Sequence, residues 1–129
     1  MSQVFVEVGA GELIDKITIL HIKLENIHDE EKLKNIRYEL SVLEKSRDDA
    51  LPSSTELTAL TDQLKEINQQ LWTIEDDIRD CEAASDFGSR FIELARAVYK
   101  TNDRRAAVKK EINLLTGATI VEEKSYQNY

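Results

Sequence analysis

Two pairs of carboxylates in this chain have a spacing that suits metal chemistry. Glu12 and Asp15 stand three residues apart, and Asp77 and Asp80 repeat that spacing later in the chain. Residues three apart in an α-helix lie on the same face, so each pair would present both carboxylates to one site. Two such pairs from two helices can hold Mg²⁺ around a phosphate group, because this ion prefers oxygen ligands. A magnesium-dependent, phosphate-directed site is therefore one of two hypotheses for this chain.

Further polar residues would complete such a small-ligand site. The arrangement resembles the all-α nucleotide pyrophosphohydrolases, but the paired glutamates that those enzymes place on the preceding helix, ExxE, are missing here. The simpler interpretation of acidic residues three apart is a solvated helix face. In the magnesium hypothesis the metal or acid–base groups are Glu12, Asp15, Glu75 and Asp76, and the groups that hold a small anion are Lys16, Arg79, Arg105 and Lys109.

Other kinds of catalytic or metal chemistry have little support in the sequence. His21 and His28 stand seven residues apart and suggest transition-metal ligation together with Cys81, but no spacing fixes a third or fourth ligand. The chain has no Gly-x-Ser-x-Gly turn and no glycine-rich phosphate loop. A partly buried histidine and a packed cysteine are the expected roles of these residues.

A line of polar and aromatic residues runs beside the apolar seam of the longest predicted helix. The seam repeats every three or four residues from Leu57 to Cys81. Both lines have the spacing of one side of a helix, and a helix that only packs on its neighbours needs the seam alone. The extra line predicts either a surface for another helix or the wall of a site. Its members are Asn68, Trp72, Glu75, Arg79 and Glu82.

The last predicted helix has a matching irregularity, because after Val98 its apolar seam continues into Thr101 and Arg105. A polar seam residue can fix the register of two helices at some cost in stability, and this is the interpretation that we favour. In the other interpretation the polar residues of both helices face a common cavity. Antiparallel pairing about a turn near Asp86 permits this, since it places Asn68 near Arg105. The residues concerned are Asn68, Glu75, Arg79, Asn102, Arg105 and Lys109.

Hydrophobic periodicity predicts an all-α bundle of four helices built on a long antiparallel hairpin. Helix interiors exclude Gly and Pro, and the chain has only four Gly and one Pro. Asp29 is a candidate helix cap, Ser53 and Glu56 form a capping-box pattern, Pro52 separates two helices and Gly117 is a natural stop. The chain is predicted to be a single helical domain over residues 1–129, with helices at about 11–27, 30–51, 54–84 and 89–116, a short strand at 4–8, and a tail at 118–129 in which residues 118–121 pair with that strand.

Composition and charge limit the classes of partner. The formal net charge of −8 argues against general binding to nucleic acid or to anionic membranes, because both require a basic surface. A lone cysteine, Cys81, excludes an intrachain disulfide. The opening MSQVFVEV lacks the basic start and long apolar run of a signal peptide, and no segment approaches about 18 uninterrupted apolar residues. We expect a soluble, cytoplasmic protein that binds neither nucleic acid nor membrane.

Several stretches of the chain resemble a family of small, functionally uncharacterised helical proteins of bacteria and their phages. These stretches are GELIDKITIL at 11–20, INQQLWTIEDDIR at 67–79, FIELARAVYKTNDRRAAVKKEIN at 91–113 and VEEKSY at 121–126. The resemblance spans nearly the whole chain, and it implies no activity, substrate or cofactor. It implies that the recurrent polar positions of the family fall here on Glu12, Asp15, Lys16, Glu75, Asp76, Arg79, Asn102, Asp103 and residues 122–126.

The function that we predict is a non-enzymatic protein-interaction or assembly module, acting on a protein partner or by self-association as a homo-oligomer. Trp72 and Tyr99 are the expected contact anchors, since aromatic side chains contribute disproportionately at interfaces. No cofactor is expected unless the magnesium hypothesis holds. The candidate residues for binding a ligand or a partner are Glu12, Asp15, Lys16, Asn68, Trp72, Glu75, Asp76, Arg79, Tyr99, Asn102, Arg105 and Lys109.

Overall fold

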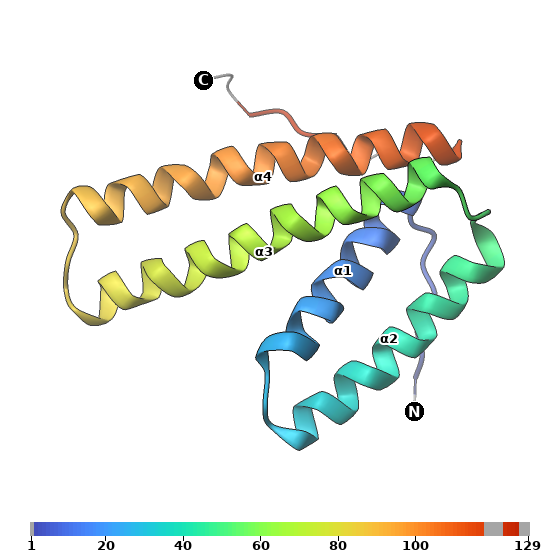
Figure 1. The fold of residues 1–129 in the computed structure, drawn as a ribbon, viewed down its shortest axis with the longest axis horizontal. Coiled ribbons are helices and arrows are strands. Elements are labelled where there is room, and N and C mark those ends of the chain that lie inside the picture. The colour runs from blue at the N-terminus through green and yellow to red at the C-terminus, as the bar shows by residue number, and fades with distance from the viewer. Residues whose placement is uncertain (1, 118–122, 127–129) are drawn as a thin grey trace.

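Four α-helices make up the regular structure of this chain (Figure 1). The structure is a computed structural model, and it describes residues 2–117 and 123–126. The helices are α1 (Ala10–Asn26), α2 (Glu30–Ala50), α3 (Thr55–Ala83) and α4 (Ser89–Thr116). Each helix end lies within one residue of the position that the sequence predicts. The all-α fold class built on a long helical hairpin is confirmed.

Helix α1 joins the two hairpins of the fold. α3 and α4 form the long antiparallel pair, and α1 contacts α2, α3 and α4, whereas α2 packs against α1 alone within the described part of the chain. Figure 1 shows the α1–α2 hairpin against the half of the α3–α4 pair that is remote from the turn between them. From this junction the two hairpins diverge, so the other half of α3–α4 extends beyond the bundle.

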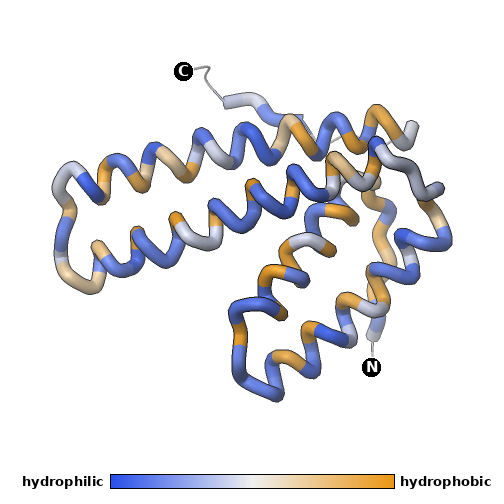
Figure 2. The backbone as a smooth tube through the Cα atoms, viewed as in Figure 1, coloured by the Kyte–Doolittle hydropathy of each residue, from blue (hydrophilic) through white to orange (hydrophobic). Residues whose placement is uncertain are grey.

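The core lies where α1 meets the other helices. Ile14 and Ile17 of α1, Leu64 of α3 and Ile112 of α4 are almost completely buried in one hydrophobic cluster, which Leu40 of α2 joins. Figure 2 shows hydrophobic residues recurring at helical spacing along all four helices. A helix that is apolar on most of its sides is predicted to be central, and α1 occupies that position.

The helix ends follow local chemistry. Asp29 caps α2 by accepting hydrogen bonds from the backbone amides of Glu31 (3.0 Å) and Lys32 (3.4 Å). For α3 the capping-box prediction is wrong by one residue: Ser54, not Ser53, accepts a bond from the Leu57 amide at 3.0 Å. Either serine suits the role by residue type, and Ser54 has the extended backbone that a cap residue adopts.

The strand predicted at residues 4–8 does not form. Residues 2–9 have no regular secondary structure, and no strand occurs elsewhere in residues 2–117 or 123–126. The apolar side chains of Val4, Phe5 and Val6 lie in solvent. A strand needs a partner for its backbone groups, and its predicted partner at 118–121 lies outside the described residues. None of the helices in the described ranges has the length and apolarity needed to span a membrane.

Gly11 allows α1 to approach the backbone of α4. Its amide donates a hydrogen bond to Asn113 Oδ1 at 2.8 Å. A Cβ atom at this position would lie 2.4 Å from the backbone oxygen of Lys109, which is closer than Cβ atoms are found to any neighbour. Any side chain here would therefore push the two helices apart.

We predict that Gly11→Ala destabilises the fold by about 1–3 kcal/mol, the usual cost of forcing extra atoms into a packed site. Replacing glycine by alanine inside a helix ordinarily raises the free energy of unfolding, so this variant should change stability in the opposite direction. Urea unfolding followed by circular dichroism measures the change. Gly88→Ser is the matched control, because a Cβ there lies 3.4 Å from its nearest neighbour and serine is a good helix cap, so its stability should change by only a few tenths of a kcal/mol. Equal losses in the two variants would contradict this account.

Candidate functional site

A buried carboxylate, Asp15, connects three helices. Its side chain is 1% exposed and accepts a hydrogen bond from Arg105 Nε of α4 at 3.0 Å and a second bond from Arg105 Nη2. Its Oδ1 atom also accepts a bond from Asn68 Nδ2 of α3 at 2.8 Å. The bidentate geometry matches the planar fork of arginine to the carboxylate, so both the position and the rotation of α1 are specified.

Thr18 completes this cluster from the next turn of α1. Its hydroxyl oxygen accepts a bond from Asn68 Nδ2 at 2.9 Å, and the hydroxyl donates to the backbone oxygen of Asp15 at 2.8 Å. In the described ranges no buried side-chain nitrogen or oxygen lacks a hydrogen-bond partner. We call Asp15, Thr18, Asn68 and Arg105 the polar layer. A fully satisfied layer of this kind specifies one arrangement of the helices.

A second ion pair lies one turn away from the polar layer. Lys109 Nζ of α4 donates to Glu12 Oε2 of α1 at 2.8 Å, and the lysine side chain is only 13% exposed. Lys16 lies 3.7 Å from the other oxygen of Glu12 and is exposed. Together with the bond between Gly11 and Asn113, these contacts fasten the first half of α1 along α4.

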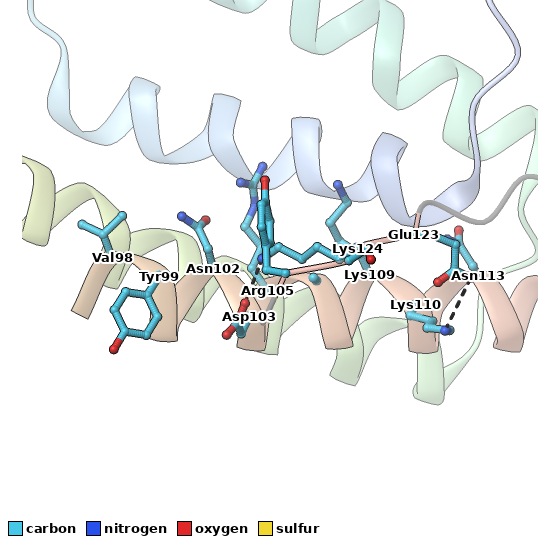
Figure 3. Close-up of a pocket in the computed structure, with 13 residues that line it drawn as sticks. Val98, Tyr99, Asn102, Asp103, Arg105, Lys109, Lys110, Asn113, Glu123 and Lys124 are labelled. Atoms are coloured by element: carbon cyan, nitrogen blue, oxygen red, sulfur yellow. Dashed lines mark hydrogen bonds and ion pairs between the residues drawn. The ribbon is translucent and has the colours of Figure 1, made fainter. Parts of the chain in front are cut away.

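A cavity of about 940 Å³ lies between α4 and residues 123–126 (Figure 3). Lys124 Nζ lies 2.9 Å from Asp103 Oδ1, and Lys110 Nζ lies 3.7 Å from Glu123 Oε1. These two ion pairs hold residues 123–126 along α4. We call this space the tail cavity. Its polar and aromatic lining includes Tyr99, Asn102, Asp103, Arg105, Lys109, Lys110, Asn113, Glu123, Lys124 and Tyr126.

A second hollow of about 540 Å³ lies in the angle where α1 and α3 diverge. Four of its residues, Asn68, Trp72, Glu75 and Arg79, belong to the extra line that the sequence places beside the α3 seam. The floor is apolar where Ile19, Ile22, Leu71 and Trp72 meet, and the rim carries Glu75, Asp76 and Arg79. We call this hollow the notch. Arg105 lines both the notch and the tail cavity.

Glu75 and Arg79 are exposed at the notch and bond to each other. Arg79 Nη1 donates to Glu75 Oε2, and also to the backbone oxygen of Glu75 at 3.3 Å. The two side chains face solvent at the rim, where a surface ion pair contributes little to stability. They are therefore available for contact with another molecule.

The residues of the magnesium hypothesis are not gathered into one site. Asp15 is bonded to Asn68 and Arg105, and Asp77 lies 3.4 Å from Arg90. Asp77 follows Asn68 by nine residues, a distance of about 13 Å along the helix axis. In the described parts of the chain no group of three or more His, Cys, Asp or Glu residues is placed to hold a metal ion. Of the other sulfur and nitrogen candidates, Cys81 is buried, His21 lies 3.7 Å from Glu44, and His28 is exposed.

The structure sorts the twelve predicted residues into three groups. The first group forms the polar layer and its neighbouring ion pairs, the second lines the notch, and the third lines the tail cavity. Arg105 belongs to all three groups. Sequence reasoning missed Thr18 and Asn113. Thr18 could have been found from its position three residues after Asp15, which places both on one face of α1. Asn113 could have been found because it continues the line of Asn102 and Lys109 on α4.

The fold and the site define a class of all-α proteins in which a short helical hairpin is fastened to a longer one through a buried polar layer. Within that class the chain belongs to the Family of unknown function (DUF6165), whose model matches residues 4–129. No curated protein matches the chain, and no solved structure does. The match therefore establishes the family without bringing an activity to the site.

We predict that Arg105→Met lowers the free energy of unfolding by about 3–5 kcal/mol, because it leaves the buried Asp15 carboxylate without its cation. The double variant Asp15→Leu/Arg105→Met should regain most of this loss, since Asn68 Nδ2 keeps its bond to Thr18. Chemical unfolding of each variant measures the changes. Arg79→Met removes a pair on the exposed surface and should cost at most about 1 kcal/mol. A loss at Arg105 no larger than that at Arg79 would show that the polar layer does not hold the fold.

Proposed function

We propose that this protein is a non-enzymatic interaction module that binds a partner helix in the notch. The observation that carries the proposal is the lining of the notch, which combines an apolar floor around Trp72 with a polar rim that includes Arg79. Tryptophan and arginine are the side chains that most often dominate binding at interfaces, above all when apolar contacts surround them. The notch resembles such an anchor site in its chemistry.

The shape of the notch favours a helix as the occupant. Its α3 residues recur at positions 68, 72, 75 and 79, which is one straight stripe on the helix surface. From residue 68 to residue 79 the stripe is about 16 Å long, or three turns of helix. Stripes of this spacing receive the ridge of another helix. Asn68 is buried against α1, whereas Trp72 is half-buried and Glu75 and Arg79 are exposed. A partner helix of three to four turns fits the available length.

The charge around the notch favours a basic partner. From Glu75 to Asp86 the chain carries six acids and one base, Arg79. Arg79 pairs with Glu75, and Arg90 pairs with Asp77, while Asp76 and Asp80 have no basic neighbour within ion-pair distance in the described residues. These acids also crowd the C-terminal end of α3, where the helix dipole is unfavourable for them. The proposed occupant is therefore an amphipathic helix with basic residues beside its apolar face.

Trp72 provides a direct test because it is the only tryptophan of the chain. Three helical peptides of about 14 residues share one leucine face and differ in carrying lysine, glutamine or glutamate at the flanking positions. We predict that the lysine peptide shifts Trp72 fluorescence to shorter wavelength and binds most tightly, and that the glutamate peptide binds weakest. Asp76→Lys should reduce the preference for lysine over glutamate by roughly fivefold or more, because it reverses a charge at the rim.

Glu39→Lys on α2 is the matched control. It makes the same change in net charge at an exposed site away from the notch, so the preference among the peptides should persist. Two results would contradict the proposal: a Trp72 spectrum that none of the three peptides changes, or equal binding of the lysine and glutamate peptides. If a second copy of the chain is the occupant instead, dilution of the protein alone will change the Trp72 spectrum.

The tail cavity supports a second candidate function, the binding of a small anion. Its lining carries four bases and two acids in a chain whose net charge is −8. Glu12 and Asp15 lie behind Lys109 and Arg105 and hold these cations in place. The volume of about 940 Å³ lies within the range of ligand sites, and Tyr99 and Tyr126 offer rings to an apolar body.

Melting curves with phosphate, pyrophosphate, citrate and adenosine monophosphate test this second candidate. A ligand that binds only the folded state raises the melting temperature, by an amount that grows with its concentration. We predict a rise with at least one of these anions, and a smaller rise in Lys124→Met, which removes a cation at the cavity wall. Lys45→Met on α2 lies outside the cavity and should behave as the wild type. Absence of any rise across the four anions would exclude this candidate.

A further inference from the structure

The segment before α1 exposes an unusual amount of apolar surface. Val4, Phe5 and Val6 are 84%, 89% and 73% exposed, and Val8 is 43% exposed. In Figure 1 the segment is drawn without helix or strand up to the start of α1. Four neighbouring apolar side chains in water are unfavourable, and a patch of this kind usually marks a surface that another molecule covers.

The backbone of the same segment has no hydrogen-bond partner among the described residues. Residues 2–8 make no hydrogen bond to any other part of the described structure. Their composition, with three β-branched valines and a phenylalanine among residues 4–8, favours a strand. A segment with strand-forming residues and open backbone donors and acceptors is a template for pairing with another strand.

We propose that residues 4–8 pair with the same residues of a second copy of this chain, forming an antiparallel two-stranded ribbon across a two-fold axis. In a symmetric antiparallel pair one residue lies opposite its own copy. A centre at Glu7 would place two carboxylates directly opposite each other, which is unfavourable. A centre at Val6 places Val4 opposite Val8 and Phe5 opposite Glu7.

The centre at Val6 also separates the side chains by type. All six valines of the two copies then lie on one face of the ribbon, because side chains alternate along a strand. The sequence of this short segment is therefore complementary to itself in both its side chains and its backbone. An isolated ribbon of two strands is weakly stable, so the association should depend on protein concentration in the micromolar range or above. This surface is distinct from the notch, and the proposal does not rest on the function proposed above.

Cross-linking tests the pairing and its register. In a Cys81→Ala background, Val6→Cys places two thiols opposite each other, within the separation that a disulfide requires. Val4→Cys is the matched control, because its own copy lies four residues away along the ribbon, at about 13 Å. We expect mild oxidation to give a covalent dimer of the Val6→Cys variant at least tenfold more readily than of the Val4→Cys variant. Equal yields, or no dimer from either variant, would overturn the proposal.

Light scattering on the full chain gives an independent measurement. We expect the average mass to rise towards that of a dimer with concentration, and to stay at the monomer mass in Val6→Lys, which puts two ammonium groups opposite each other. Leu114→Lys introduces the same charge at a residue of matching exposure, 71%, and should keep the dimer. Circular dichroism should show the same helix content in both variants. A wild-type chain that stays monomeric at every concentration, or a Val6→Lys variant that still dimerises, would refute the pairing.

Discussion

The bond between the buried Asp15 carboxylate and Arg105 is the constraint on which the rest of the structure depends. Among the helices of the described residues, α1 alone contacts the other three, and it meets them largely through apolar side chains. Apolar burial stabilises this contact but does not direct it, because it depends on area and not on orientation. The bidentate pair and the bond from Asn68 fix the rotation of α1 about its axis, and with α1 in this position every buried side-chain nitrogen and oxygen of the described residues has a hydrogen-bond partner.

This constraint explains why polar residues interrupt the seams of α3 and α4. Asn68 stands beside the apolar seam of α3, and Arg105 follows Thr101 where the seam of α4 should continue. Replacing such a layer by apolar residues is often neutral or stabilising in other proteins, so its contribution lies in specifying one arrangement more than in free energy. Gly11 adds a steric condition, since α1 crosses α4 at a distance that only a residue without a side chain permits.

The sequence predicts the elements of this fold better than their contacts. The helix bounds follow from hydrophobic spacing and from caps such as Asp29 and Gly117, which act within a few residues of the chain. Antiparallel register places Asn68 near Arg105, and both bond to Asp15. The role of Asp15 itself was not predictable, because the side chains that surround it come from residues 53 and 90 positions away.

The same limit accounts for the predictions that differ from the structure. Spacing shows that Asp77 and Asp80 share a helix face, but the distance of that face from Asp15 depends on where α1 crosses α3. The strand at 4–8 was predicted from composition, yet a strand also needs a neighbour, and composition does not supply one. The extra line on α3 was predicted as either a surface for another helix or the wall of a site, and four of its five residues line the notch, whereas Glu82 does not.

Arg105 links the notch and the tail cavity. Its guanidinium is 29% exposed, and it borders both the notch and the tail cavity. Asp15 holds the Arg105 guanidinium through two hydrogen bonds. The part of each hollow that Arg105 lines is therefore fixed in position. An occupant of the notch and an occupant of the tail cavity would therefore both lie beside the same fixed cation. The carboxylate that fixes the crossing of α1 thus also fixes the part of the surface that both hollows share.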